Sequence, residues 1–409
     1  MEAKQDQALK ERAQRVIPNG MWGHMDAARI PVAYPQYFAR ARGCRLWDVD
    51  GREYIDFLCA YGPMVLGYGD PDVELAAERQ RREGDIFNGP TARLVELAEA
   101  VVGTIAHADW AMFQKNGTDA MTTCVSIARE ATGRRKILVA NGAYHGAVPW
   151  CNPYPAGSTP EDRAHLVRYD YNDAASLAAA AETCRGDLAA ILVSGFKHDV
   201  GKHHELPMAD FAGAARQLCD EAGAALIVDD VRAGFRIHMG GSWETVGIRP
   251  DLSAFSKAIA NGYPLACVTG SERFRAAAAR VFVTGSFWYG AVAMAAALAT
   301  LDKLGGIGGI AIMERMGQRL RDGIAAQAAG RGIRLRQSGP PQMPVILFED
   351  DDDRRKGWTF CAEALKRGTY LHAAHTMFLS AAHTEADIDR ALEATDAALG
   401  VVAERFGWQ

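Results

Sequence analysis

Two stretches decide the fold of this chain: Ile227-Val228-Asp229-Asp230-Val231 and Phe255-Ser256-Lys257-Ala258-Ile259-Ala260-Asn261-Gly262. In the first, an aspartate pair ends an apolar run, and in the second a lysine follows another apolar run. Short apolar runs bounded by turn residues are typical of buried strands. Ligands bind at the carboxyl ends of such strands in an open α/β sheet. We therefore expect Asp229 and Lys257 to meet at that edge.

Further apolar runs alternate with alanine-rich helical stretches through the middle of the chain. The alternation predicts an α/β fold with a mostly parallel sheet that is covered on both faces. The expected strands are 137–140, 189–193, 225–228, 252–255 and 265–269, and the expected helices include 174–183, 209–222 and 291–304.

The two ends of the chain have a different pattern. An amphipathic helix is expected over residues 4–16, and a β-hairpin around Asp50-Gly51 within residues 44–57. After residue 305 the order becomes helix, strand (345–348), helix (358–367), short strand and last helix from Glu385. We expect a small α+β domain built from residues 1–60 and 306–409, and a large domain over residues 61–305.

Composition excludes several classes of partner. The chain has 409 residues, a formal charge of −5 and 49% apolar residues, so it has no basic field for nucleic acid or anionic lipid. No apolar run approaches the ~20 residues of a membrane span. Eight scattered cysteines without a C-x-x-C pattern indicate reduced thiols. These features predict a cytoplasmic protein with no nucleic-acid or membrane partner.

An acid and a lysine at successive strand ends are what a pyridoxal 5'-phosphate (PLP) enzyme needs. The Asp229 carboxylate would keep the pyridine nitrogen protonated, and the Lys257 amine would form the Schiff base. A surface lysine is the competing interpretation, but apolar Phe255, Ala258 and Ile259 surround Lys257 in the sequence.

Three other stretches could complete such a site. Gly117 and Thr118 begin a helix after a short apolar segment, where free N–H groups can bind phosphate. An ordinary capped helix is the alternative. Tyr144 follows an expected strand and could stack on a flat ring, as Val231 could on the other face. Thr284–Gly290 offers hydroxyls and turn glycines as a second phosphate contact.

Taken together, these stretches resemble the class III, fold type I PLP aminotransferases, the group that includes glutamate-1-semialdehyde aminomutase. The resemblance covers about residues 15–398 and includes Leu46–Asp56, Asn116–Ala120 and Asp229–Arg236. It implies Lys257 as the covalent cofactor lysine, Asp229 on the pyridine nitrogen, Tyr144 and Val231 on the ring faces, and Gly117 and Thr118 on the phosphate. It also implies a homodimer with shared active sites, in which Ser286 reaches the neighbouring subunit's phosphate.

Departures from the family pattern bear on the substrate. Where the aminomutase carries an arginine for the substrate carboxylate, this sequence has Asp26, with Arg29 three residues later. The gating segment after Tyr144-His-Gly146 is short, and 372–378 lacks an acidic residue. Because a mutase must retain its intermediate, a short lid favours transamination between two substrates.

Asn19–His24, Lys115–Asp119 and Thr284–Trp288 look most like the fumonisin-type amine aminotransferases. That likeness implies a primary amine without an α-carboxylate, long-chain or hydroxylated, with a keto acid such as pyruvate as acceptor. Trp22, Phe287 and Trp288 are candidate pocket walls, and packing at a dimer interface is the alternative interpretation of these aromatic residues.

Two rival functions remain at this stage. An aminomutase or β-amino acid aminotransferase would use Arg29 for a carboxylate, and a PLP-fold binding module would have lost catalysis. Retention of Lys257 and Asp229 argues against the latter. His198, His203 and His204 are expected to face solvent rather than bind metal, so no metal site is predicted, whereas His372 and His375 could approach the substrate.

Overall fold

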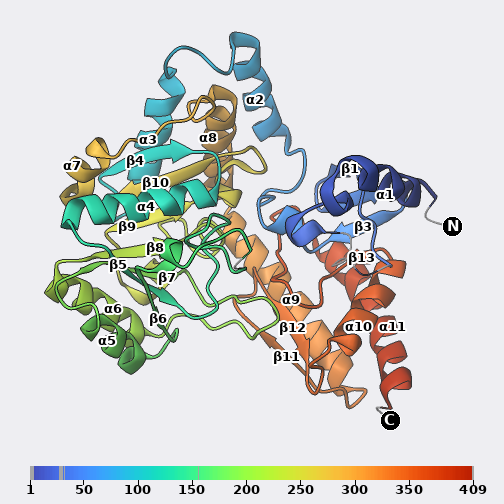
Figure 1. Cartoon of the computed structure of the whole chain (residues 1–409). Helices are drawn as coiled ribbons and strands as arrows, with labels where there is room; N and C mark the ends of the chain where they lie inside the picture. The colour runs from blue at the N-terminus through green and yellow to red at the C-terminus, as the bar shows by residue number, and fades with distance from the viewer. Residues whose placement is uncertain (1–3, 27–30, 32, 155, 408–409) are drawn as a thin grey trace.

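A computed structural model describes residues 4–26, 31, 33–154 and 156–407 of the chain. Its largest element is a seven-stranded sheet in the order β4-β10-β9-β8-β7-β5-β6, on the left of Figure 1. Arg29 lies outside the described residues. The strands are β4 (Trp110–Gln114), β5 (Lys136–Ala140), β6 (Leu166–Tyr169), β7 (Leu188–Ser194), β8 (Ala225–Asp229), β9 (Leu252–Phe255) and β10 (Ala266–Gly270).

Strand direction follows from the length of the connections. β5 to β9 pair in parallel, whereas β10 runs antiparallel to both β9 and β4. Parallel neighbours need a crossover of a dozen or more residues. Only the short segment 256–265, with one 3₁₀ turn at Lys257–Ala260, joins β9 to β10. The mostly parallel sheet expected from the sequence is confirmed.

Helices cover both faces of the sheet. Ile137 and Val139 of β5 pack in one apolar cluster with α4 (Gly117–Thr132) and α7 (Glu272–Arg280). Leu138 and Ala140 point the other way, into a cluster with α5 (Ala174–Glu182) and α6 (Ala209–Ala222). This alternation gives continuous apolar strands because each face is buried. α2 (Pro71–Glu83), α3 (Ala92–Thr104) and α8 (Ala291–Gly306) pack together beyond β4 and β10.

No single helix among the described residues is long and apolar enough to cross a membrane. α8 and α9 (Gly309–Ala329) reach that length and apolarity only as a pair, and they are bent by 67°.

The two ends of the chain meet in a second, four-stranded sheet of order β1-β2-β3-β13, on the right of Figure 1. β13 comes from the C-terminal part and pairs in parallel with β3. The expected hairpin is present as β2 and β3, and the expected first helix as α1. The remaining α-helices and strands of the described residues are α1 (Lys4–Val16), β1 (Phe38–Arg42), β2 (Arg45–Asp48), β3 (Glu53–Asp56), β11 (Leu335–Ser338), β12 (Val345–Phe348), α10 (Arg355–Lys366), β13 (Thr369–Tyr370) and α11 (Glu385–Phe406).

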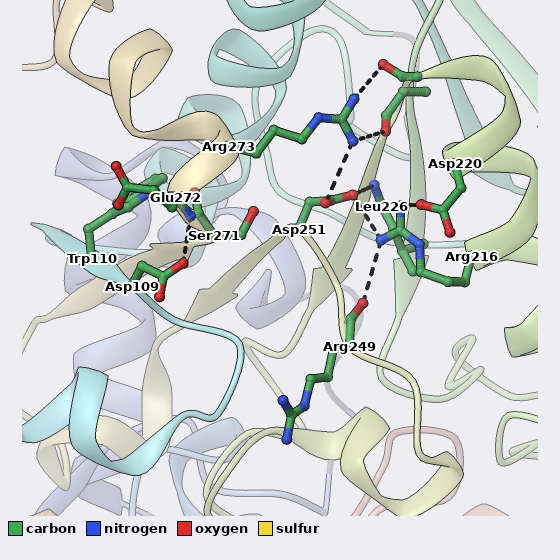
Figure 2. A network of polar contacts seen from close by, with 12 residues as sticks. Asp109, Trp110, Arg216, Asp220, Leu226, Arg249, Asp251, Ser271, Glu272 and Arg273 are labelled. Atoms are coloured by element: carbon green, nitrogen blue, oxygen red, sulfur yellow. Dashed lines mark hydrogen bonds and ion pairs between the residues drawn. The ribbon is translucent and has the colours of Figure 1, made fainter.

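An ionic network fixes the amino ends of β8 and β9 (Figure 2). Asp251, directly before β9, accepts hydrogen bonds at Oδ2 from the Leu226 backbone N–H (2.8 Å) and from Arg216 Nη1 (2.9 Å). Arg216 also pairs with Asp220 (2.7 Å), and Arg273 of α7 lies 3.9 Å from Asp251. The network thus joins α6 and α7 to the sheet at the edge opposite Asp229 and Lys257.

Replacing Asp251 with alanine should lower the free energy of unfolding by about 2–3 kcal/mol, because the buried Leu226 N–H loses its side-chain acceptor and the Arg216 guanidinium loses the less exposed of its two carboxylate partners. Urea denaturation followed by circular dichroism measures the change. Arg185→Ala, which breaks the exposed pair with Glu182, is the control and should leave the denaturation midpoint in place. An equal loss in both variants would contradict the assignment.

Candidate active site

A pocket of about 240 Å³ opens at the carboxyl edge of the large sheet. Its walls come from the segments that follow five strands, β4, β5, β7, β8 and β9, so the parallel topology itself brings them together. The lining residues are Asn116, Gly117, Thr118, Met121, Tyr144, His145, Gly146, His198, Asp229, Val231, Arg232, Ser256 and Lys257.

Asp229 is the last residue of β8, and both of its carboxylate oxygens are held. Oδ2 accepts a hydrogen bond from His145 Nδ1 at 2.7 Å, and Oδ1 accepts one from the Val231 backbone N–H at 3.1 Å. The Asp229 side chain is only 8% exposed. Its neighbour Asp230 points away and accepts from the Ser242 backbone N–H at 2.9 Å. The pair therefore divides into a pocket carboxylate and a structural one.

Lys257 follows β9 and is half-buried against the pocket. Its Nζ donates a hydrogen bond to the Tyr61 carbonyl at 3.0 Å. Burial, reinforced by the positive charges of Arg232 and Arg236, lowers the pKa of Lys257 to about 7. Its backbone has φ 48°, a left-handed conformation that costs a non-glycine residue energy. The structure therefore holds a lysine whose neutral amine form is substantially populated near pH 7.

The carbonyl that binds Lys257 belongs to a strained turn. Cys59, Ala60 and Tyr61 all have positive φ, between 47° and 64°. Asp56 fixes the start of this turn by accepting from the Leu58 and Cys59 backbone N–H groups. Buried Arg236 fixes its end, with Nη2 2.6 Å from the Gly62 carbonyl. The turn is thus set by the fold rather than by local preference.

The first turn of α4 forms another wall. Asn116 caps the helix, and the 3.0 Å hydrogen bond from the Asp119 N–H to its side chain leaves the neighbouring Gly117 and Thr118 at the pocket. A Cβ on Gly117 would lie 2.6 Å from Val231 Cγ1, so only glycine lets these two segments approach. The Thr118 hydroxyl accepts from the Ala147 N–H at 3.2 Å. This helix N-terminus can bind an anion.

Not every predicted residue joins the pocket. Tyr144 lies there and is 46% exposed, but Trp22 and Phe287 are 64% and 66% exposed at the surface. Ser286 is exposed and Trp288 half-buried, and neither contributes to the pocket wall of this chain. Asp26 is half-buried and accepts from Asn19 Nδ2 at 3.5 Å. The candidate substrate residues are therefore dispersed, unlike the candidate cofactor residues.

Sequence reasoning missed a buried polar group beside the pocket. His198 and His204 were expected to face solvent, but they are 9% and 5% exposed because they pack around Phe196. Burial lowers the pKa of both, to about 3 for His204. Arg232 lies next to His198, with Nη1 3.1 Å from Nδ1. Among the described residues, no group of three or more His, Cys, Asp or Glu side chains could hold a metal ion.

The chemistry of the lining residues fits pyridoxal phosphate. The α4 N-terminus suits a phosphate, the Asp229 carboxylate suits a protonated ring nitrogen, and Val231 and Tyr144 offer surfaces for the ring. Lys257 supplies an amine with a lowered pKa for the aldehyde. Gly117 keeps open the space that a side chain would fill. The pocket therefore has a matching group for each part of that cofactor.

Comparison with known proteins gives the same result. The chain is 50% identical over 398 residues to an aminopentol aminotransferase of Sphingopyxis macrogoltabida, covering 97% of this chain and 94% of that protein. It is 33% identical to a glutamate-1-semialdehyde 2,1-aminomutase of Leptothrix cholodnii, covering 96% and 97%. The solved PLP internal aldimine form of the FumI protein of a Sphingopyxis species superposes with a TM-score of 0.98 at 49% identity, over 100% and 99% of the two chains. The sequence model of the family described as aminotransferase class-III matches residues 29–399 of the chain. The chain therefore belongs to the class III aminotransferases, which are PLP-dependent enzymes.

Proposed function

We propose that this enzyme transfers the amino group of a primary amine without an α-carboxylate to a keto acid such as pyruvate. Lys257 binds the cofactor covalently, and Asp229 holds the proton on its ring nitrogen. Val231 and Tyr144 pack on the ring faces, and Gly117 and Thr118 bind its phosphate. When bound, the cofactor supplies an electron sink for the carbon that carries the amine.

The protein groups account for the proton movements. With the cofactor bound, the Lys257 amine would act as the general base that takes the proton from the amine-bearing carbon and as the general acid that gives it back. Its lowered pKa keeps much of it unprotonated near neutral pH. The His145 hydrogen bond orients the Asp229 carboxylate, and the low exposure of Asp229 strengthens its electrostatic effect.

One observation carries the substrate assignment: the Tyr61 turn that binds Lys257 is packed against uncharged aromatic rings. Tyr61 contacts the rings of His24 (4.5 Å between centroids) and His375 (5.0 Å). Burial lowers the pKa of both histidines, so these rings are uncharged near neutral pH. With Asp26 where a carboxylate-binding arginine would stand, this wall suits an aliphatic or hydroxylated chain. The similarity to an aminopentol aminotransferase supports the same choice.

We further propose a homodimer with shared active sites, in which Ser286 contacts the phosphate of the neighbouring subunit. Two exposed loops carry apolar residues: Ile86 and Phe87 in one, and Phe282 (91% exposed) and Phe287 in the other. Asp85 joins the first loop to the start of α8, directly after the second loop, because its carbonyl and carboxylate accept from the Ala291 and Val292 N–H groups. Such an exposed apolar patch is typical of a protein interface.

We also propose that the chain forms two domains and that the protein is cytoplasmic. The large domain is residues 61–305, and the small one combines 1–60 with 306–409; the pairing of β3 with β13 supports this division. All eight cysteines are free and buried, which supports a reducing, cytoplasmic environment.

Replacing Lys257 with alanine should lower transamination by about 10²–10⁴-fold, because the group that moves the proton is lost. Borohydride should attach the cofactor to Lys257 in the wild type, as peptide mass spectrometry will show. Cofactor uptake by the apoprotein should accelerate as pH rises through about 7 and then level off, since only the neutral amine attacks. Lys202→Ala, at the surface, is the control. Attachment elsewhere would contradict the proposal.

An amine-donor screen with pyruvate, read as alanine formation, should favour hydroxylated long-chain primary amines over α-amino acids by at least about tenfold in kcat/KM, because the aromatic rings packed on the Tyr61 turn beside Lys257 are uncharged. The same mixtures without pyruvate are the control. Conversion of a donor without any keto acid would instead indicate an aminomutase, and activity with α-amino acids alone would exclude the amine assignment.

Phe282→Asp should shift the sedimentation coefficient from that of a dimer towards that of a single chain, because a charge would be buried in the interface. Val200→Asp is a matched control, since Val200 is also exposed (60%) but lies outside the patch. Unchanged sedimentation of the Phe282 variant at micromolar concentration would show that this patch is not the interface.

A further inference from the structure

Arg232 is a cation in the pocket wall whose hydrogen bonds, among the described residues, go only to neutral acceptors. It follows Val231 and lines the pocket together with Asp229 and Lys257. No carboxylate of a described residue forms an ion pair with it. Its recorded contacts all use Nη1, which donates to His198 Nδ1 (3.1 Å), the His198 carbonyl (3.4 Å) and Thr376 Oγ1 (3.1 Å). These acceptors are neutral.

The neutrality of these partners is set by the fold. Burial, with the charge of Arg232 as the next cause, lowers the pKa of His198 well below its usual range. His198 Nδ1 must be unprotonated to accept from a guanidinium, which agrees with that shift. Other groups that influence Arg232 electrostatically are Asp229, Tyr144 and Asp199, and burial lowers the pKa of Arg232 to about 10. The negative charges of Asp229 and Asp199 offset part of the cost of burying Arg232 without forming an ion pair with it, so an anion that pairs directly with the guanidinium would add stabilisation.

Arg236, four residues later, shows what a purely structural arginine looks like here. Its guanidinium donates to the carbonyls of Gly62 and Leu379 and stacks on Phe378, with 5.1 Å from Cζ to the ring centroid. It is fully buried and does not line the pocket. Arg232 differs, because none of the hydrogen bonds among the described residues uses its Nε or Nη2. Those N–H groups remain for a ligand.

We propose that Arg232 is the anion-binding residue of the active site, and that its Nε and Nη2 groups hold a ligand oxyanion next to Lys257. The inference rests on the proposed transamination. Two ligands carry such an oxyanion: the cofactor, through its phenolic oxygen, and the keto acid acceptor, through its carboxylate. The cofactor phosphate already has the N-terminus of α4. A primary amine brings no carboxylate, so one pocket can serve both substrates when Arg232 binds only the acceptor.

The first arm of the test needs no substrate. In the wild-type holoenzyme and in Arg232→Gln, the visible absorption of the bound cofactor is titrated against pH. If the oxyanion is the phenolic oxygen, loss of the cation should move the midpoint to higher pH by on the order of one unit. Because this arm measures only the bound cofactor, it tests Arg232 even if the enzyme proves inactive with every primary amine.

The second arm compares two acceptors, pyruvate and propanal, which has no carboxylate. If the oxyanion is the acceptor carboxylate, Arg232→Gln should lower the ratio of kcat/KM for pyruvate to that for propanal by at least about tenfold, the loss expected for a charged hydrogen bond. The kcat/KM for the amine donor should change much less, because the donor has no carboxylate. Arg185→Gln, at the surface, is the control and should alter neither arm.

A shift in either arm supports the proposal and names the source of the oxyanion. An unchanged midpoint together with an unchanged acceptor ratio, in a variant that keeps its cofactor and its thermal midpoint, overturns it. If Arg232→Gln does not fold, Arg232→Lys is measured in both arms. It keeps the charge but loses the planar fork, so a smaller change in one arm is expected, and wild-type values in both arms overturn the proposal as well.

Discussion

The hydrogen bond between Lys257 Nζ and the Tyr61 carbonyl is the interaction on which the rest of the site depends. It joins the connection after β9 to a turn that lies far away in the sequence. Both partners have left-handed backbones, so neither geometry would persist in an isolated peptide. Asp56 and Arg236 fix the turn at Cys59–Tyr61, and the short connection between β9 and β10 fixes the backbone of Lys257. The surrounding fold thus stabilises a strained arrangement that keeps a neutral amine in position.

Much of the fold could be predicted from the sequence because apolar runs and helical stretches alternate so regularly. β8 and β9 have nearly the expected bounds, and α6 has the expected ones. β4, β6 and β11 were missed as strands. β4 is mostly apolar but pairs with the distant β10, whereas β6 and β11 are short and contain charged or polar residues. The antiparallel direction of β10 is a consequence of connection length, which the apolar pattern alone does not reveal.

The candidate site likewise contains residues that the sequence predicts and contacts that it does not. Asp229, Lys257, Gly117 and Tyr144 could be placed at one edge because each follows a strand, and the topology does the rest. The Tyr61 carbonyl is a backbone group, so its contact with Lys257 could not be predicted from the amino acid at position 61. The burial of His198 and the exposure of Arg232 to the pocket depend on packing against residues near Thr376, far along the chain.

The network around Asp251 has a consequence for how this enzyme can change. It anchors α6 and α7 at the amino edge of the sheet, whereas every wall of the pocket follows a carboxyl end. Tolerance to heat and choice of substrate are therefore governed by separate sets of side chains. Substitutions at the amino edge can therefore raise thermal stability, and substitutions at the carboxyl edge can change substrate specificity, with little coupling between the two sets.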